Sequence, residues 1–169
     1  MLCGCRTSAR EPGHQPSEAS ASHLQPTASD PLLRASEAIV ERMQGPRDFS
    51  HLSEPERNFI VAWVLSGEVG NGGFDQYFFN TSGDQATLAP AALRAVGAAD
   101  AAALAEQANM LFGAAGPPAD RAKRWAAMDT IPESTRTRWT ELDEQFYKIS
   151  DLDAKLLAYI TAHEDEFSH

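Results

Sequence analysis

Residues 69–80 combine side chains that could form a binding pocket. Four of the six residues from 74 to 79 are aromatic, and several glycines precede them. The amide side chains of Asn71, Gln76 and Asn80 could supply the polar wall of a pocket, with Tyr77 and its aromatic neighbours as the floor. Such a pocket would bind a small molecule.

A packed helical corner explains the same residues and is the favoured interpretation. At helical spacing Phe74, Tyr77 and Phe78 share one face, and aromatic stripes of this kind usually fill cores. Gly72 and Gly73 would let the turn approach a neighbouring helix closely. In this interpretation Gln76 and Asn80 hydrogen-bond to loop backbone.

Acidic residues concentrate near the C-terminus and could bind a basic protein. Between residues 141 and 169 only Lys148 and Lys155 oppose eight acids, so this stretch holds six of the ten excess negative charges. The eight acids are Glu141, Asp143, Glu144, Asp151, Asp153, Glu164, Asp165 and Glu166. Carboxylates four residues apart on a helix rise about 6 Å, comparable with phosphate spacing along DNA. From these residues alone, an ordinary solvated face is the preferred explanation.

Enzyme chemistry has weak support. His163-x-x-Glu166 has the spacing of a helical metal-ligand pair, but no second pair accompanies it, and Cys3-x-Cys5 lacks further ligands. Neither a nucleophile elbow nor a phosphate-binding loop with its Lys-Ser/Thr occurs. We therefore expect a protein that is not an enzyme and that uses no metal or cofactor.

A basic cluster interleaved with Trp125 and Trp139 raises the question of nucleic acid. It consists of Arg121, Lys123, Arg124, Arg136 and Arg138. The net charge of the chain is -10, which repels phosphate, so direct nucleic-acid binding is not expected. These arginines should instead lie over aromatic rings, pair with Asp129, Glu133 or Glu141, or face an acidic patch on a dimer mate.

The length and composition indicate a single globular domain. A chain of 169 residues, with 43% apolar and 22% charged side chains, can bury one core. No apolar stretch is long enough to span a bilayer, and only four residues precede Cys5, so we expect a cytoplasmic protein. A start codon further upstream would change this expectation, because residues 2–5 resemble the end of a lipoprotein signal.

Residues 1–29 are predicted to form a disordered tail, and residues 30–169 one compact all-α domain of several helices. The tail is rich in Ser, Ala, Pro, Gln and Glu and poor in large apolar residues. Cap residues, glycine and proline breaks and apolar stripes mark the helices that follow. Ser53 and Glu56 have the spacing of a capping box, Asp100 and Asp151 are expected to cap later helices, and the glycines of residues 67–73 should end the second helix. They are expected at 30–44, 53–66, 74–79, 87–96, 100–112, 119–128, 132–149 and 151–160. No alternating β-branched run indicates a strand.

Three stretches together resemble the signature of the DNA-mimic-protein-19-like family, catalogued as a domain of unknown function. They are Gly-Gly-Phe-Asp-Gln-Tyr-Phe-Phe-Asn at 72–80, Ser-Gly-Asp at 82–84 and Ala-Leu-Arg-Ala-Val-Gly-Ala at 92–98, within a similar region covering roughly 32–167. Gly70 stands where the family often has a polar residue. The resemblance implies an all-α fold, dimerisation and, for the best-understood member, mimicry of DNA that occupies a helix-turn-helix transcription regulator.

Three functions remain open from the sequence. The first is an acidic module that occupies the DNA-binding surface of a basic partner such as a transcription regulator. The second is an immunity-type stoichiometric inhibitor of a toxin or nuclease. The third is a small-molecule site lined by Asn71, Gln76, Tyr77 and Asn80.

Overall fold

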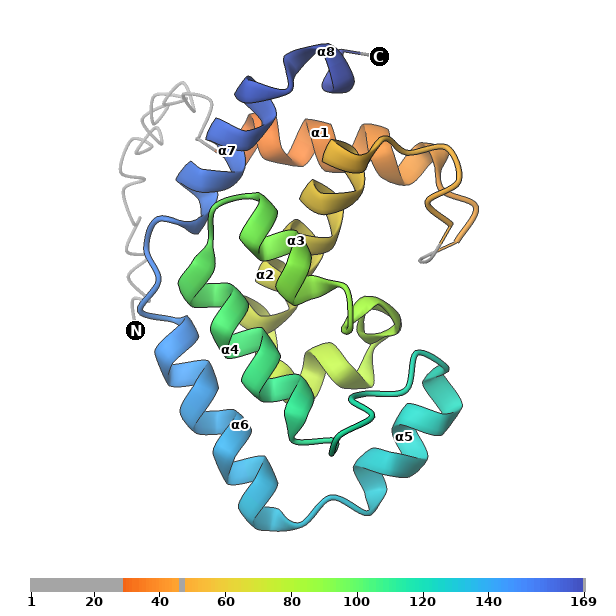
Figure 1. Cartoon of the computed structure of the whole chain (residues 1–169), viewed down its shortest axis with the longest axis vertical. Coiled ribbons are helices and arrows are strands. Elements are labelled where there is room, and N and C mark those ends of the chain that lie inside the picture. Colours follow the sequence, from red (N-terminus) through yellow and green to blue (C-terminus); the bar gives the residue numbers. More distant parts are fainter. Residues whose placement is uncertain (1–28, 46–47, 169) are drawn as a thin grey trace, which may run out of the picture.

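A computed structural model describes residues 29–45 and 48–168, and these residues form helices without a strand (Figure 1). The all-α fold is confirmed, whereas the predicted tail lies almost wholly outside the described residues. The helices are α1 (Ser29–Arg42), α2 (Glu54–Phe79), the 3-10 helix η1 (Thr81–Gln85), α3 (Ala89–Ala95), α4 (Ala99–Met110), α5 (Arg121–Asp129), α6 (Glu133–Phe146), α7 (Leu152–Ala162) and α8 (Glu164–Phe167). Within the described part of the chain, no helix is long and apolar enough to cross a membrane.

The long helix α2 is the centre of the fold. Its sequence is apolar nearly all round, so that Phe59, Ile60, Val61, Ala62 and Leu65 are all buried. It packs against α1, α3, α5, α6, α7, α8 and η1. Figure 1 shows α2 running through the middle of the molecule, and α6 packs against it.

The start of α2 is fastened by a reciprocal cap. Ser53 accepts a hydrogen bond from the Glu56 amide at 3.4 Å, and the Ser53 amide donates to the Glu56 carboxylate at 2.9 Å. This confirms the capping box predicted from the sequence. Arg42, at the end of α1, forms an ion pair with the same buried carboxylate, so one glutamate joins two helices.

The glycines of α2 break it at a single place. Gly72 and Gly73 have non-helical backbone angles, and Gly73 has φ +76° and ψ -177°. A break was predicted somewhere in residues 67–73. It occurs at the last two residues of that range, because Gly67 and Gly70 remain helical. The aromatic residues 74–79 then form a short second segment of α2.

Two predicted caps differ from the structure. Helix α4 begins at Ala99 with Ala98 at the capping position, so Asp100 lies in its first turn and does not cap it. Asp151 precedes α7 but makes no capping hydrogen bond. Its carboxylate instead forms an ion pair with Lys155 at 2.9 Å, four residues along the helix.

An aromatic cluster fills the core around the second segment of α2. The Phe78 ring centroid lies 4.8 Å from that of Phe112 and 5.2 Å from that of Trp139. The Phe74 ring meets Phe146 edge-on at 6.0 Å. The Trp139 indole N–H donates to the Ala108 carbonyl at 3.2 Å, so its polar atom is satisfied inside the core. These contacts join α2, α4 and α6.

Candidate functional site

The aromatic stripe of the motif is part of the core. Phe74, Tyr77 and Phe78 are each at most 1% exposed, as their helical spacing predicted. The Tyr77 hydroxyl is buried and has no hydrogen-bond partner among the described residues. Burial raises the pKa of this phenol, which stays protonated at neutral pH.

The amides of the motif converge on a glutamate that the sequence reasoning missed. Glu68 accepts hydrogen bonds from Gln76 Nε2 at 3.2 Å, Asn80 Nδ2 at 2.8 Å and Ser82 Oγ at 3.0 Å. Gln76 and Asn80 are therefore held by a carboxylate, whereas loop backbone was the expected partner. The sequence indicates this contact only weakly, because Glu68 precedes the glycine break and its three donors follow it.

The pocket predicted from Asn71, Gln76, Tyr77 and Asn80 does not match this geometry. Tyr77 is buried, Gln76 and Asn80 are bound to Glu68, and Asn71 is exposed. A cavity of about 370 Å³ does lie nearby, but Glu68 and Ser82 line it and none of those four residues does. The motif mainly organises packing.

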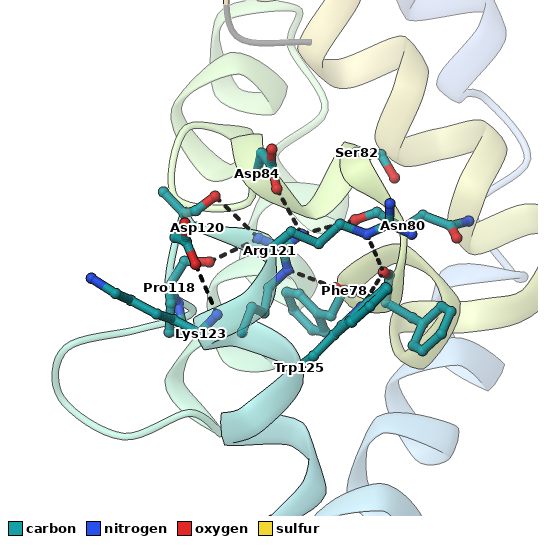
Figure 2. A network of polar contacts seen from close by, with 12 residues as sticks. Phe78, Asn80, Ser82, Asp84, Pro118, Asp120, Arg121, Lys123 and Trp125 are labelled. Carbon is teal, nitrogen blue, oxygen red and sulfur yellow. Dashed lines mark hydrogen bonds and ion pairs between the residues drawn. The ribbon is translucent and has the colours of Figure 1, made fainter.

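A buried guanidinium fastens the end of the motif to the following elements. Arg124 is 0% exposed and donates to the carbonyl oxygens of Phe78 at 2.6 Å, Asn80 at 2.9 Å and Pro118 at 2.8 Å. It also pairs with Asp84 at 2.8 Å. Figure 2 shows these groups converging from the end of α2, η1 and the segment before α5. Nothing in the local sequence indicated that this member of the basic cluster would be buried.

The other cationic groups of the basic cluster have mostly local partners. Arg121 lies over the Trp125 ring, 4.4 Å from its centroid, and Arg138 pairs with Glu141 at 2.5 Å, as the sequence suggested. Arg136 pairs with Asp75 rather than with Asp129 or Glu133. Three arginines are thus engaged at the surface by a ring or a carboxylate, and among the described residues neither Arg121 nor Lys123 has an ion pair.

Asp143, one of the eight predicted binding acids, has a structural contact. Its Oδ1 accepts a hydrogen bond from the Phe74 amide at 2.8 Å, which caps the second segment of α2 at the glycine break. A Cβ atom on Gly73 would lie 2.3 Å from Asp143 Oδ2, so a side chain there would collide with this cap. Burial raises the pKa of the Asp143 carboxyl, against the opposing effect of the Phe74 hydrogen bond.

Five of the eight acids lie in α6, in α7 or in the turn that joins these helices (Figure 1), and we call this stretch, together with Asp100 of α4, the acidic corner. It comprises Glu141, Asp143, Glu144, Asp151, Asp153 and, from α4, Asp100. Asp100 and Asp151 line one open cavity of about 510 Å³ together with Lys148. Glu144 and Asp153 are exposed and have no ion pair among the described residues. Asp100 was missed because only the fold brings α4 to this place.

The remaining three predicted acids lie elsewhere. Glu164, Asp165 and Glu166 form α8, beyond the far end of α7 (Figure 1). Nine helical residues, 154–162, lie between Asp153 and α8, and they rise about 14 Å. The eight acids therefore fall into two groups, and all of them except Asp143 are exposed.

His163, from the weak metal-ligand motif, already has contacts inside the protein. His163 Nδ1 lies 2.9 Å from the Tyr159 carbonyl oxygen, and its ring lies 4.3 Å from the Tyr159 ring. Over residues 29–45 and 48–168, no group of three His, Cys, Asp or Glu side chains is arranged to hold a metal ion. Cys3 and Cys5 lie outside these residues.

Comparison with known proteins agrees with the resemblance seen in the sequence. Neither the curated proteins nor the solved structures contain a match to this chain. The family model described as DMP19-like protein matches residues 50–163. This range includes the kinked helix α2, the Glu68 and Arg124 networks and the acidic corner. With most of its length matched, the chain belongs to the DMP19-like protein family.

Proposed function

We propose that this protein is an acidic binding module whose acidic corner occupies the DNA-binding surface of a basic protein, such as a transcription regulator. The observation that carries the proposal is the exposure of Glu144 and Asp153 without cationic partners. Each such carboxylate can attract a lysine or arginine without first losing an internal ion pair. Family membership supports the same direction.

The neighbouring acids extend this surface at little cost. Glu141 and Asp151 are exposed, and each forms an ion pair with one side chain of its own helix. Exposed pairs of this kind contribute about 0–1 kcal/mol, so a partner arginine can replace the internal cation easily. Asp100 adds a fifth carboxylate from α4.

Asp143 is the one acid of the acidic corner that we exclude from the proposed contact surface. It is only partly exposed, and its carboxylate already caps the Phe74 amide. Its substitution would disturb α2, so a binding defect in such a variant would have two explanations. We therefore leave it unchanged in the test below.

The test is affinity capture from the native host with the triple variant Glu144→Gln, Asp151→Asn and Asp153→Asn. We expect the wild-type protein to retain a basic DNA-binding protein at low salt and to release it as salt rises, because the attraction is screened. The triple variant should retain little of it. DNA carrying the partner's own site should displace the wild-type protein.

A matched control removes the same charge from another surface. Glu37 and Glu41 on α1 and Glu133 at the start of α6 are exposed and have no ion pair among the described residues. Their neutralisation should leave capture unchanged. Equal loss in both variants would mean that net charge alone drives retention, and undiminished capture by the corner variant would refute the proposal. Retention of a toxin or nuclease, without competition by DNA, would favour stoichiometric inhibition instead.

A further inference from the structure

A cavity of about 370 Å³ between α1, α2 and η1 is unused by the proposed function. Its wall is apolar over most of its area, and its polar groups come from one side. The apolar side chains are Val40, Met43, Ile60 and Val64, whereas Glu68, Thr81, Ser82 and Gln85 supply the polar groups. Small-molecule sites have this size and this composition.

The carboxylate of Glu68 determines which ligand would fit. Its three hydrogen-bond donors, Gln76, Asn80 and Ser82, are all neutral, and it has no ion pair among the described residues. These donors orient the carboxylate, and none of them brings a positive charge to it. The buried cation Arg124 is already paired with Asp84. Glu68 therefore presents an uncompensated negative charge beside an apolar wall.

Geometry leaves room for one more donor on Glu68. Oε2 accepts from both Gln76 and Asn80, whereas Oε1 accepts only from Ser82. A carboxylate oxygen can accept two hydrogen bonds, so Oε1 has an open position. The buried Ser82 hydroxyl lines the same cavity. A ligand group that donates to Glu68 Oε1 could therefore also donate a hydrogen bond to Ser82 Oγ.

We propose that this cavity binds a small organic compound with a primary ammonium group and an aliphatic body. The ammonium donates to Glu68 Oε1 and Ser82 Oγ, and the aliphatic body contacts Val40, Met43, Ile60 and Val64. An anion would be repelled by Glu68. A neutral apolar compound would cover the carboxylate without pairing it, which is unfavourable.

The probe is n-pentylammonium chloride, titrated into the full-length protein and followed by amide chemical shifts. We expect saturable shifts at Val64, Glu68 and Ser82. Pentan-1-ol should bind at least tenfold more weakly, and sodium pentanoate should cause no shift at these residues. Equal binding of the alcohol, or no saturable shift with the ammonium compound, would overturn the proposal.

Two variants locate the site. Glu68→Gln removes the charge at almost constant size, and its affinity for pentylammonium should fall at least tenfold, to that of the alcohol. Val64→Phe keeps Glu68 and fills the cavity, and should abolish binding. Glu133→Gln is the matched control and should bind like the wild type, because Glu133 is an exposed acid far along the chain from this cavity. Unchanged affinity in the two site variants, or loss in the control, would contradict the assignment. If the site variants do not fold, the comparison of the three probes on the wild type still decides.

This inference is independent of the acidic corner, since the two sites share no residue. Loss of pentylammonium binding in Glu68→Gln should leave capture of a basic protein intact. Neutralising Glu144, Asp151 and Asp153 should likewise leave pentylammonium binding intact.

Discussion

Glu68 and Glu144 are both helical glutamates, yet the fold treats them differently. Glu68 accepts three hydrogen bonds from the motif that follows it, whereas Glu144 is exposed and has no ion pair within the described chain. The same contrast separates the two regions to which they belong. Around the motif, polar groups are used for internal connections, and in the acidic corner most of them face solvent.

This difference suggests a division of labour. Polar groups with internal partners keep their positions and specify a unique packing, because leaving any one of them unpaired is costly. Exposed carboxylates contribute little to folding and can serve binding. The motif should thus matter for stability and the acidic corner for partners, and four experiments test that separation.

The largest effect on stability is expected from Arg124→Met. This change leaves the carbonyls of Phe78, Asn80 and Pro118 without their donor and the Asp84 carboxylate without its cation. Breaking a buried ion pair from one side costs about 3–5 kcal/mol. Urea unfolding should therefore show a loss of that order.

Arg138→Met is the control for that measurement. Arg138 is exposed and pairs with an exposed glutamate, so the expected cost is about 0–1 kcal/mol. A similar loss of unfolding free energy in both variants would contradict the expected difference between the buried and the exposed arginine.

Gly73→Ala should have the next largest effect. Gly73 has φ +76° and ψ -177°, a conformation essentially restricted to glycine, and a Cβ there would collide with the Asp143 carboxylate. The backbone strain alone costs about 1–3 kcal/mol. The free energy of unfolding should fall by at least that amount.

Gly70→Ala serves as the matched change in the same helix. Gly70 is exposed and helical, and a Cβ on it would meet nothing within 4 Å. Alanine should stabilise the protein by about 0.5–1 kcal/mol. Destabilisation here would mean that the whole glycine-rich stretch, and not only the break, is needed.

Asp143→Asn tests the one acid that belongs to both regions. Burial raises the folded-state pKa of Asp143 above its ordinary value of 3.8, so ionised Asp143 is less favourable in the folded than in the unfolded protein. Its contribution to stability is therefore larger when protonated, and it declines as the pH rises from 3.8 through the folded-state pKa. The wild type minus variant difference in unfolding free energy should decrease over this window, as measured by urea unfolding at several pH values. A constant difference would contradict this role.

The smallest effect on stability is expected from Glu144→Gln combined with Asp153→Asn. Both side chains are exposed and without ion pairs among the described residues. Surface changes of this kind alter stability within about ±0.5 kcal/mol. Thermal unfolding should barely change while partner capture falls, and a marked loss of stability would show that the acidic corner also holds the fold together.

Local patterns in the sequence predicted most helices and part of the core. The Ser53 to Glu56 capping box, the burial of Phe74, Tyr77 and Phe78 and a break within the glycines of residues 67–73 all followed from short-range spacing. These features depend on neighbours within one or two turns of helix. The cap assigned to Asp100 failed because several neighbouring residues could begin the same alanine-rich helix.

Only tertiary structure decided which polar side chains are connected and which are available. Arg124 reaches carbonyls more than forty residues away, and Asp143 caps an amide 69 residues away. The arrangement of α4, α6 and α7 places Asp100 on the same cavity as Asp151. It also separates the acids of α8 from the acidic corner. The sequence alone established an acidic, helical chain with a glycine-broken aromatic motif, since composition and local spacing determine these. The partners of each charge depend on contacts between distant segments, which local spacing does not encode.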